Sequence, residues 1–252
     1  MPSLIVARLY ANLKSGCMKQ ILIKASSIIA SICFLIALLI SLIHVICFNR
    51  SFFAYEYEKN NQAEVIGMNG EDLMEATDVL LDYLQEKRDD ISIRAEINGM
   101  TTEVFTTRES MHMADVRNLY QNALTVGNVS ALICAVLVIM LGINLKQKAA
   151  AVFVDGLENA LFMIGWFIGC IVIWAILDFS NFWMDFHYIF FDNDLFLLDA
   201  SRSVMINMFP ESFFADLVFA IIICFSVICG MIYFGLKRYD FWRMNHDTCR
   251  II

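Results

Sequence analysis

Four long apolar runs constrain this chain of 252 residues more than any other feature. They lie at about 25–48, 127–145, 157–177 and 214–236. A helix needs about 20 mostly apolar residues to cross the hydrocarbon core of a bilayer, so each run can cross once. Hydrophobic residues make up 59% of the chain, against roughly 45–50% in soluble domains. The sequence therefore predicts an integral membrane protein of the all-α class, a bundle of four transmembrane helices.

The basic residues predict how this bundle is oriented, because positive charge near the ends of spans is retained in the cytoplasm. Lysine and arginine residues cluster before the first run, after the second and after the fourth. These places fall on one side of the membrane, so both termini are predicted to be cytoplasmic. In chain order, the predicted segments are a cytoplasmic N-terminal segment (1–24), the first helix (25–48), an extracellular cap (49–126), the second helix (127–145), a cytoplasmic loop (146–156), the third helix (157–177), an extracellular aromatic-rich segment (178–213), the fourth helix (214–236) and a cytoplasmic tail (237–252).

The extracellular cap is predicted to be α+β, with one amphipathic helix and one β-hairpin. Asn69 is a suitable N-cap, and the acidic residues Glu71 and Asp72 favour the positive end of a helix. Apolar residues then recur at helical spacing over 73–84. Two alternating runs follow on either side of Asn98-Gly99, a strong hairpin signal.

The segment 178–213 sets aromatic rings among acidic and amide side chains. An aromatic belt at the membrane interface explains some of the rings. It does not explain the polar residues between them, and polar groups against apolar walls are typical of a small-molecule site. The rings expected to line such a site are Phe182, Trp183, Phe186, Tyr188, Phe190 and Phe191.

Two histidines far apart in the sequence are predicted to converge on the outer membrane face. His112 precedes the second apolar run and His187 follows the third. A neutral imidazole is the usual general base near neutral pH, and a carboxylate beside it can set its tautomer. Asp115 shares a face with His112 if that stretch is helical. Asp185 can serve His187 in the same way only if the chain there is not a regular helix.

The remaining histidines and motifs narrow the chemistry. His246 is predicted to be solvated in the polar tail, whereas His44 is an intramembrane ionisable residue, which makes it a candidate for function. The sequence has no G-x-S-x-G elbow, no H-E-x-x-H motif and no phosphate-binding glycine loop. Either the site is not catalytic, or it holds a metal ion, or the substrate brings its own nucleophile.

The chain has a net charge of −8 and no basic patch of the kind that binds nucleic acid, so no nucleic acid partner is expected.

Two sequence blocks around the histidines resemble the bacterial lipoprotein intramolecular transacylases, integral membrane proteins of Gram-positive bacteria. They are "FTTRESMHMADVRNLY" and "FHYIFFDNDLFLLDASRSVMINMFPESFF". The family has four helices and an extracellular cap, so the resemblance covers roughly 25–236. Phe196 stands where the family pattern has Trp, and Ala200 stands where it has Pro. Both positions are expected on the loop rather than at the histidines.

The resemblance implies an acyltransferase of the bacterial cell membrane that needs no cofactor. Its substrates would be diacylglyceryl-modified lipoproteins, with membrane lipid as a further partner. The sn-2 acyl chain would move to the α-amine of the N-terminal cysteine through an eight-membered ring, so that the substrate supplies its own nucleophile. One of His112 and His187 would be the general base, and the other would stabilise the oxyanion or protonate the leaving oxygen. The supporting residues would be Asp115, Arg108, Glu109, Asp185, Asn193 and Asp194.

Two alternatives remain at the level of sequence. In the first, His112 and His187 bind zinc in a membrane-embedded hydrolase, with Asp115, Asp185 and Asp192 as further candidate ligands. In the second, the chain is not an enzyme, and the cap is a sensor or a partner-binding module. A cap that binds a protein would expose an apolar patch away from the membrane.

Overall fold

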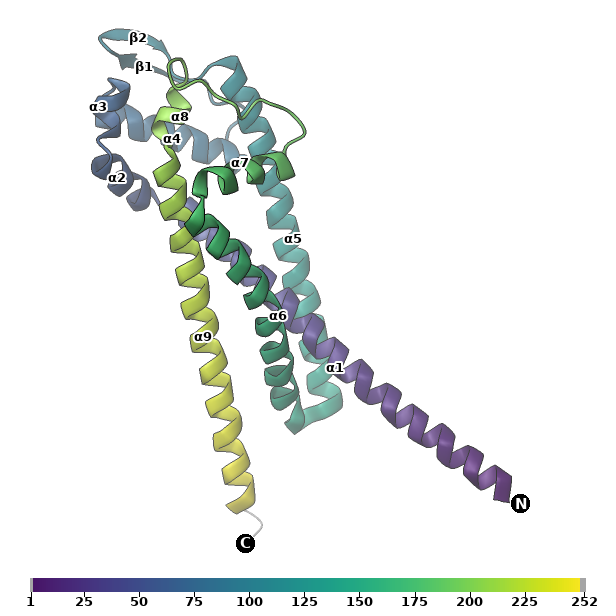
Figure 1. Cartoon of the computed structure of the whole chain (residues 1–252). Helices are drawn as coiled ribbons and strands as arrows, with labels where there is room; N and C mark the ends of the chain where they lie inside the picture. The colour runs from purple at the N-terminus through teal and green to yellow at the C-terminus, as the bar shows by residue number, and fades with distance from the viewer. Residues whose placement is uncertain (1, 250–252) are drawn as a thin grey trace. The chain divides into compact units, whose positions relative to one another are not determined.

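The computed structural model describes the backbone of residues 2–249 and the side chains of residues 18–239 and 241. The prediction for His246 falls outside the described side chains. Helices account for most of the chain, as Figure 1 shows. The elements are α1 (Pro2–Cys47), α2 (Arg50–Lys59), α3 (Gln62–Ile66), α4 (Gly70–Leu84), β1 (Arg94–Ile97), β2 (Met100–Glu103), α5 (Thr107–Leu145), the 3₁₀ turn η1 (Lys146–Lys148), α6 (Ala149–Leu177), α7 (Phe179–Phe190), α8 (Val204–Met208) and α9 (Glu211–Cys249).

Among the residues that the structure describes, three helical stretches are long and apolar enough to cross a membrane. They are Met18–Cys47, Thr107–Leu177 and Glu211–Tyr239. The second has 71 residues and includes α5, η1 and α6, so it contains two of the four predicted runs. The membrane all-α class agrees with these helices, whereas four crossings and the cytoplasmic termini stay predictions.

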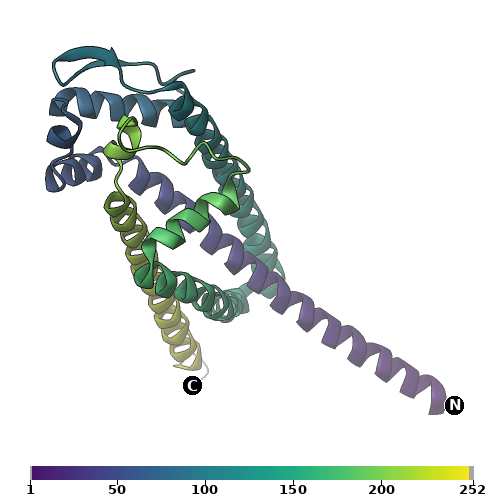
Figure 2. The ribbon, with the colours of Figure 1, turned by 45° about the horizontal axis from the view of Figure 1, so that its top comes forward.

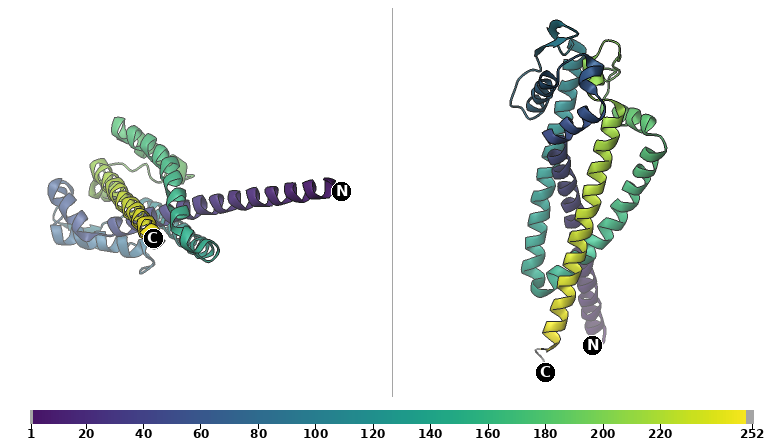
Figure 3. Two further views of the ribbon diagram at one scale, coloured as in Figure 1. Left: turned by 90° about the horizontal axis from the view of Figure 1, so that it is seen from below. Right: turned by 90° about the vertical axis from the view of Figure 1, so that its left-hand side faces the viewer.

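The chain divides into two compact units. The first combines parts of α1, α5, α6 and α9, and the second combines residues 39–126 with 171–224. In the first unit the chain reverses direction at η1, between α5 and α6 (Figure 3). Ser27 on α1 donates a hydrogen bond to the Val152 carbonyl at 2.5 Å. A Cβ atom at Gly156 would lie 2.1 Å from the Ser27 hydroxyl. Small residues therefore let α1 and α6 approach closely, as is common between membrane helices.

The second unit has one apolar core, to which α2, α4, the hairpin, α5, α8 and α9 all contribute. Its members are buried to 7% exposure or less. They include Phe53, Leu73, Leu80, Ile91, Val104, Met113, Met208 and Phe213. Because this cluster draws on segments from both halves of the chain, it holds the two predicted outer segments together.

The predicted helix and hairpin of the cap are confirmed. Asn69 accepts a hydrogen bond from the Asp72 amide at 2.8 Å and caps α4. β1 and β2 pair antiparallel, with Ile97 opposite Met100. Asn98 and Gly99 have φ of 52° and 80°, the left-handed values that an Asn-Gly turn of type I′ needs.

Two predicted loops contain more helix than expected. α6 begins at Ala149, so most of the predicted cytoplasmic loop 146–156 is helical, consistent with its alanines, which are the best helix formers. The aromatic segment 178–213 contains α7, which is capped by the Asp178 side chain on the Asn181 amide at 3.1 Å. Similarly, α5 begins at Thr107, well before the apolar run at 127. His112 and Asp115 therefore do share a helix face.

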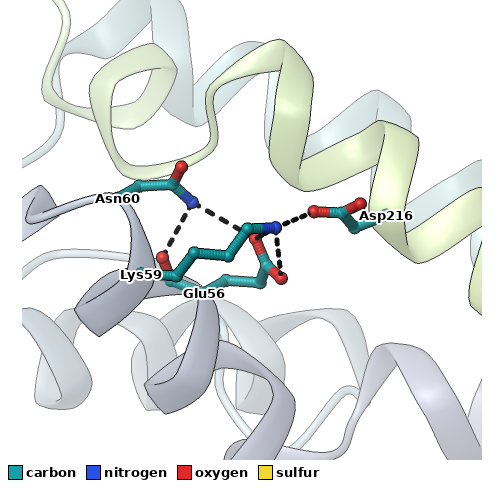
Figure 4. A network of polar contacts seen from close by, with 4 residues as sticks. All are labelled: Glu56, Lys59, Asn60 and Asp216. Atoms are coloured by element: carbon teal, nitrogen blue, oxygen red, sulfur yellow. Dashed lines mark hydrogen bonds and ion pairs between the residues drawn. The ribbon is translucent and has the colours of Figure 1, made fainter.

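An ion-pair network joins α2 to the first turns of α9 (Figure 4). The Lys59 ammonium lies 3.3 Å from the buried Glu56 carboxylate and also binds Asp216. The Asn60 amide donates to Glu56 at 3.2 Å. A buried carboxylate is stable only when it is paired and hydrogen-bonded, and this network meets both needs.

A second buried carboxylate, Glu109, joins the start of α5 to the start of α8. Glu109 is 0% exposed. It accepts hydrogen bonds from the Thr106 amide at 2.5 Å, the Ser203 hydroxyl at 2.6 Å and the Met205 amide at 2.9 Å. The Thr106 hydroxyl in turn accepts from the Glu109 amide at 3.3 Å, which completes a capping box.

We expect replacement of this carboxylate to destabilise the second unit. Glu109→Gln puts an amide group where two backbone N–H donors and a hydroxyl now converge, so a buried donor loses its acceptor. The expected loss is about 3 kcal/mol of unfolding free energy. Thermal unfolding of the detergent-solubilised protein measures it, with Glu96→Gln as the control because Glu96 is exposed on β1. Equal melting temperatures for the two variants would contradict this role.

Candidate functional site

The second unit brings the two predicted histidines together. His112 lies in the second turn of α5 and His187 near the end of α7. Their ring centroids are 6.1 Å apart. The ring of Phe191 contacts both, at 5.3 Å from His112 and 5.7 Å from His187. Residues 75 positions apart in the sequence thus form one imidazole pair against an aromatic wall.

The helix that carries His187 also sets its tautomer. His187 Nδ1 lies 2.7 Å from the Trp183 carbonyl oxygen, one turn earlier on α7. A carbonyl oxygen can only accept, so Nδ1 carries the proton and Nε2 of the neutral ring has a free lone pair. Burial lowers the pKa of His187 below its ordinary value, while the hydrogen bond to Trp183 opposes that shift. The ring is therefore mainly a neutral base at neutral pH.

Aromatic rings surround His187 closely. Phe196 stacks on it at 4.8 Å, and Trp183 meets it edge-on at 4.9 Å. Trp183 also stacks on Phe214 of α9 at 4.3 Å. The sequence prediction that Phe196 lies away from the histidines is wrong, since the loop after α7 folds back over the ring.

His112 is the more deeply buried imidazole, at 8% exposure. Its Nδ1 is buried and has no hydrogen-bond partner among the residues that the structure describes. A buried polar atom without a partner is costly, and the large majority of buried side-chain polar atoms in folded proteins have a partner. This nitrogen is therefore a buried hydrogen-bonding position without a partner among the described residues, beside the His187 ring.

The loop after α7 is held against α5 by the polar residues of the two blocks. Asn193 donates to the Asp115 carboxylate at 2.9 Å, and the Arg108 guanidinium donates to the Asp194 carbonyl. Figure 2 shows this segment starting beside the N-terminal part of α5 and running on to α8. Arg108, His112 and Asp115 are spaced i, i+4 and i+7, on one face of α5. The loop contacts therefore flank His112.

A small cavity of about 170 Å³ lies at these contacts. Its lining combines carboxylates, an amide and two phenyl rings. The residues are Asp115, Phe190, Phe191, Asp192 and Asn193. Polar groups set against aromatic walls are typical of a small-molecule site, but this cavity is smaller than the roughly 300–1,000 Å³ of such pockets.

The other predicted site residues differ in how they lie relative to His187. Asp185 is two residues from His187 on a regular helix, so the two side chains leave different faces and Asp185 does not orient the ring. The Phe182 ring packs on Trp174 at 5.5 Å. Tyr188 meets Phe196 edge-on at 5.2 Å, and Phe186 lies 5.7 Å from His187.

His44 has a partner that the sequence did not indicate. Its Nδ1 lies 2.6 Å from the Tyr120 hydroxyl, and the two rings stack. Tyr120 lies two turns after His112 on α5. His44 thus links the end of α1 to the helix that carries His112, within the second unit.

Sequence reasoning missed the contacts that hold the pair in place. The T-x-x-E pattern Thr106 to Glu109 is a capping-box signal and could have identified the start of α5. No local signal indicates that Ser203 would meet Glu109, because 94 residues separate them. Within the described part of the chain, no three His, Cys, Asp or Glu side chains are grouped to hold a metal ion, so the zinc alternative has no ligand set there.

Comparisons with known proteins identify the family and the fold of this chain. A family model described as lipoprotein intramolecular transacylase Lit matches residues 28–214. No curated protein matches the chain. The fold is similar to the in meso structure of the membrane integral lipoprotein intramolecular transacylase Lit from Bacillus cereus, with a TM-score of 0.67 and 21% identity over 92% of this chain and 99% of that chain.

Two further structures of the Bacillus cereus protein, each with one histidine replaced, by arginine and by alanine, also match. Their TM-scores are 0.65 and 0.64 at 20% identity, covering 94% and 92% of this chain and 99% of each of those chains. At these identities the solved structures show a shared fold. The family model matches most of the chain, and the chain therefore belongs to the Lit family of lipoprotein intramolecular transacylases, membrane acyltransferases of lipoprotein maturation.

Proposed function

We propose that this chain moves the sn-2 acyl chain of a diacylglyceryl-modified lipoprotein to the α-amine of its N-terminal cysteine. His112 and His187 would be the catalytic pair. The observation that carries this proposal is the pair itself, two imidazoles 6.1 Å apart against aromatic rings. No nucleophile motif accompanies them, which suits a reaction in which the amine of the substrate attacks its own ester.

His187 acts as the general base. Its Nδ1–H is held by the Trp183 carbonyl, so Nε2 can accept a proton from the attacking nitrogen. The new bond joins this nitrogen to the acyl carbon, and the bond from that carbon to the glyceryl oxygen breaks. His187 then passes the same proton to the leaving oxygen, so that proton and charge balance.

His112 stabilises the developing oxyanion. A neutral imidazole can donate one N–H, and a donor in a buried place is worth more than one in water. The 8% exposure of His112 and its unpartnered Nδ1 support this role.

The aromatic residues of α7 and its loop position the substrate. The transfer closes an eight-membered ring, which forms rarely in a free chain. Holding the reacting groups together can contribute roughly 7–11 kcal/mol at best. Trp183 stacks on Phe214, and Phe196 stacks on His187. These contacts hold the aromatic side chains of α7 and its loop in place for this purpose.

The site lies on the outer face of the membrane in this proposal. Four crossings with cytoplasmic termini follow from Lys19 and Lys24 before the first run, Lys146 and Lys148 after the second, and the basic tail. The second unit then faces outward, where lipidated N-termini of exported lipoproteins lie in the outer leaflet.

Replacing either histidine should abolish most of the turnover. Loss of general base or oxyanion donor costs about 100-fold or more, so His187→Ala and His112→Ala should leave a reporter lipoprotein with both acyl chains on the glyceryl group. Mass spectrometry of the reporter, expressed in cells lacking other amine-acylating enzymes, distinguishes this form from N-acyl, S-monoacylglyceryl cysteine.

His246→Ala is the matched control, because that histidine is predicted to lie in the cytoplasmic tail. The control should behave like the unaltered chain. If folded His187→Ala protein gave full conversion, the base assignment would be wrong.

The rate should also depend on pH in a way that reports on His187. The pKa of His187 is lowered by burial, so its neutral form is retained down to below about pH 6.5, the ordinary histidine value. Above that, the rate should follow the free amine of the substrate, whose pKa is about 8. The rate should fall more steeply only at a pH below the ordinary histidine value, where His187 with its lowered pKa becomes protonated.

Turnover rates at a series of pH values measure this, with the residual activity of His187→Gln as the reference. The rate of that variant should depend on pH only through the protonation of the substrate amine. The two profiles having the same slope at acid pH would argue against His187 as the base.

A further inference from the structure

A second and larger cavity lies in the cap, among helices that carry none of the proposed catalytic residues. Its volume is about 400 Å³, and α2, α3 and the first turns of α4 line it. The apolar part of its lining includes Ala54, Tyr57, Leu73 and Met74. A cavity of this size holds a few amino-acid side chains.

Two carboxylates at this cavity have no partner of their own. Glu58 and Glu64 are both exposed lining residues, and neither carboxylate has an ion pair or hydrogen bond among the contacts that the structure describes. Lys59, the nearest cation in the sequence, is engaged with Glu56 and Asp216. Glu58 also lies in the last turn of α2, where the helix dipole disfavours negative charge. Its charge is therefore available to an external cation.

The combination of an apolar cavity and free carboxylates suits one type of side chain. Lysine and arginine bury their aliphatic stems on apolar surface while the charged end stays near solvent. Across 50–106 acidic residues clearly outnumber basic ones, so the field of the cap attracts cations. Charge complementarity thus selects a basic peptide segment.

Contacts connect this cavity to the histidine pair. Gln62 of α3 donates a hydrogen bond to the Asn207 carbonyl of α8. The first turn of α8 is bound by Glu109 through Ser203 and Met205, and Glu109 lies one turn before His112 on α5.

We propose that the cap cavity binds a lysine- or arginine-bearing segment of the lipoprotein polypeptide that follows its lipidated cysteine. This inference rests on the proposed function for the identity of the substrate. The cavity then selects substrates by their peptide, while the histidine pair acts on the lipidated end.

The test compares two reporter lipoproteins that differ only in that segment, one with lysines and one with glutamines at the same positions. The unaltered chain should show a lower KM for the lysine reporter. The double variant Glu58→Gln, Glu64→Gln should raise that KM roughly five- to tenfold, the effect of losing two partly exposed ion pairs. Its kcat, and its KM for the glutamine reporter, should not change.

Two further variants separate the cavity from general charge effects. Glu75→Gln with Glu96→Gln removes two exposed carboxylates outside the cavity lining and should leave both KM values unchanged. Ala54→Trp fills the cavity without changing charge and should raise the KM for the lysine reporter. A KM that is equal for both reporters, or that rises equally in the Glu75/Glu96 control, would overturn the proposal.

A binding measurement keeps this test independent of turnover. An unlipidated, fluorescently labelled peptide carrying the lysine segment is titrated onto the purified protein in uncharged detergent. Binding that is lost in the Glu58/Glu64 double variant, with no acyl transfer by any form, would overturn the proposed function and support the cavity. Acyl transfer without peptide binding and without a preference between reporters would overturn the cavity proposal alone.

Discussion

The buried carboxylate of Glu109 is the interaction on which the arrangement of the second unit depends. An ionised group without solvent is stable only when hydrogen bonds replace its hydration. Three donors supply these hydrogen bonds. They are the Thr106 amide just before α5, and the Met205 amide and the Ser203 hydroxyl at the start of α8. One side chain therefore fixes where α5 begins and where α8 lies, and His112 follows it by one helical turn.

The chemistry of the site depends on a helix of ordinary geometry. Because α7 is regular, His187 Nδ1 meets the carbonyl of Trp183 one turn back, and no carboxylate is needed to set its tautomer. The neighbours of the ring are instead aromatic: Phe196 stacks on it, and Trp183 meets it edge-on. Such surroundings favour the neutral form of the imidazole, which is the form that both proposed roles require.

Local chemistry was sufficient to predict several elements from the sequence. Asn98-Gly99 forms the expected turn because both residues adopt left-handed φ values at little cost. Asn69 caps α4 as its side chain predicted. The pairing of His112 with His187 was predicted because α5 and α6 were expected to run in opposite directions. Asp185 was expected to serve His187 only if the chain there is not a regular helix, and α7 is a regular helix, so that condition is not met.

By itself, the sequence determined the membrane class, the long helices, the cap helix, the hairpin and the two histidines, since each depends on apolar length, local turn preference or residue type. The tertiary structure alone decided the rest. His44 on Tyr120, Phe191 on His112 and Ser203 on Glu109 all join residues far apart in the chain. Contacts of this kind are selected by the packing of one shared core, and no local pattern encodes which distant side chain will fill a given place in it.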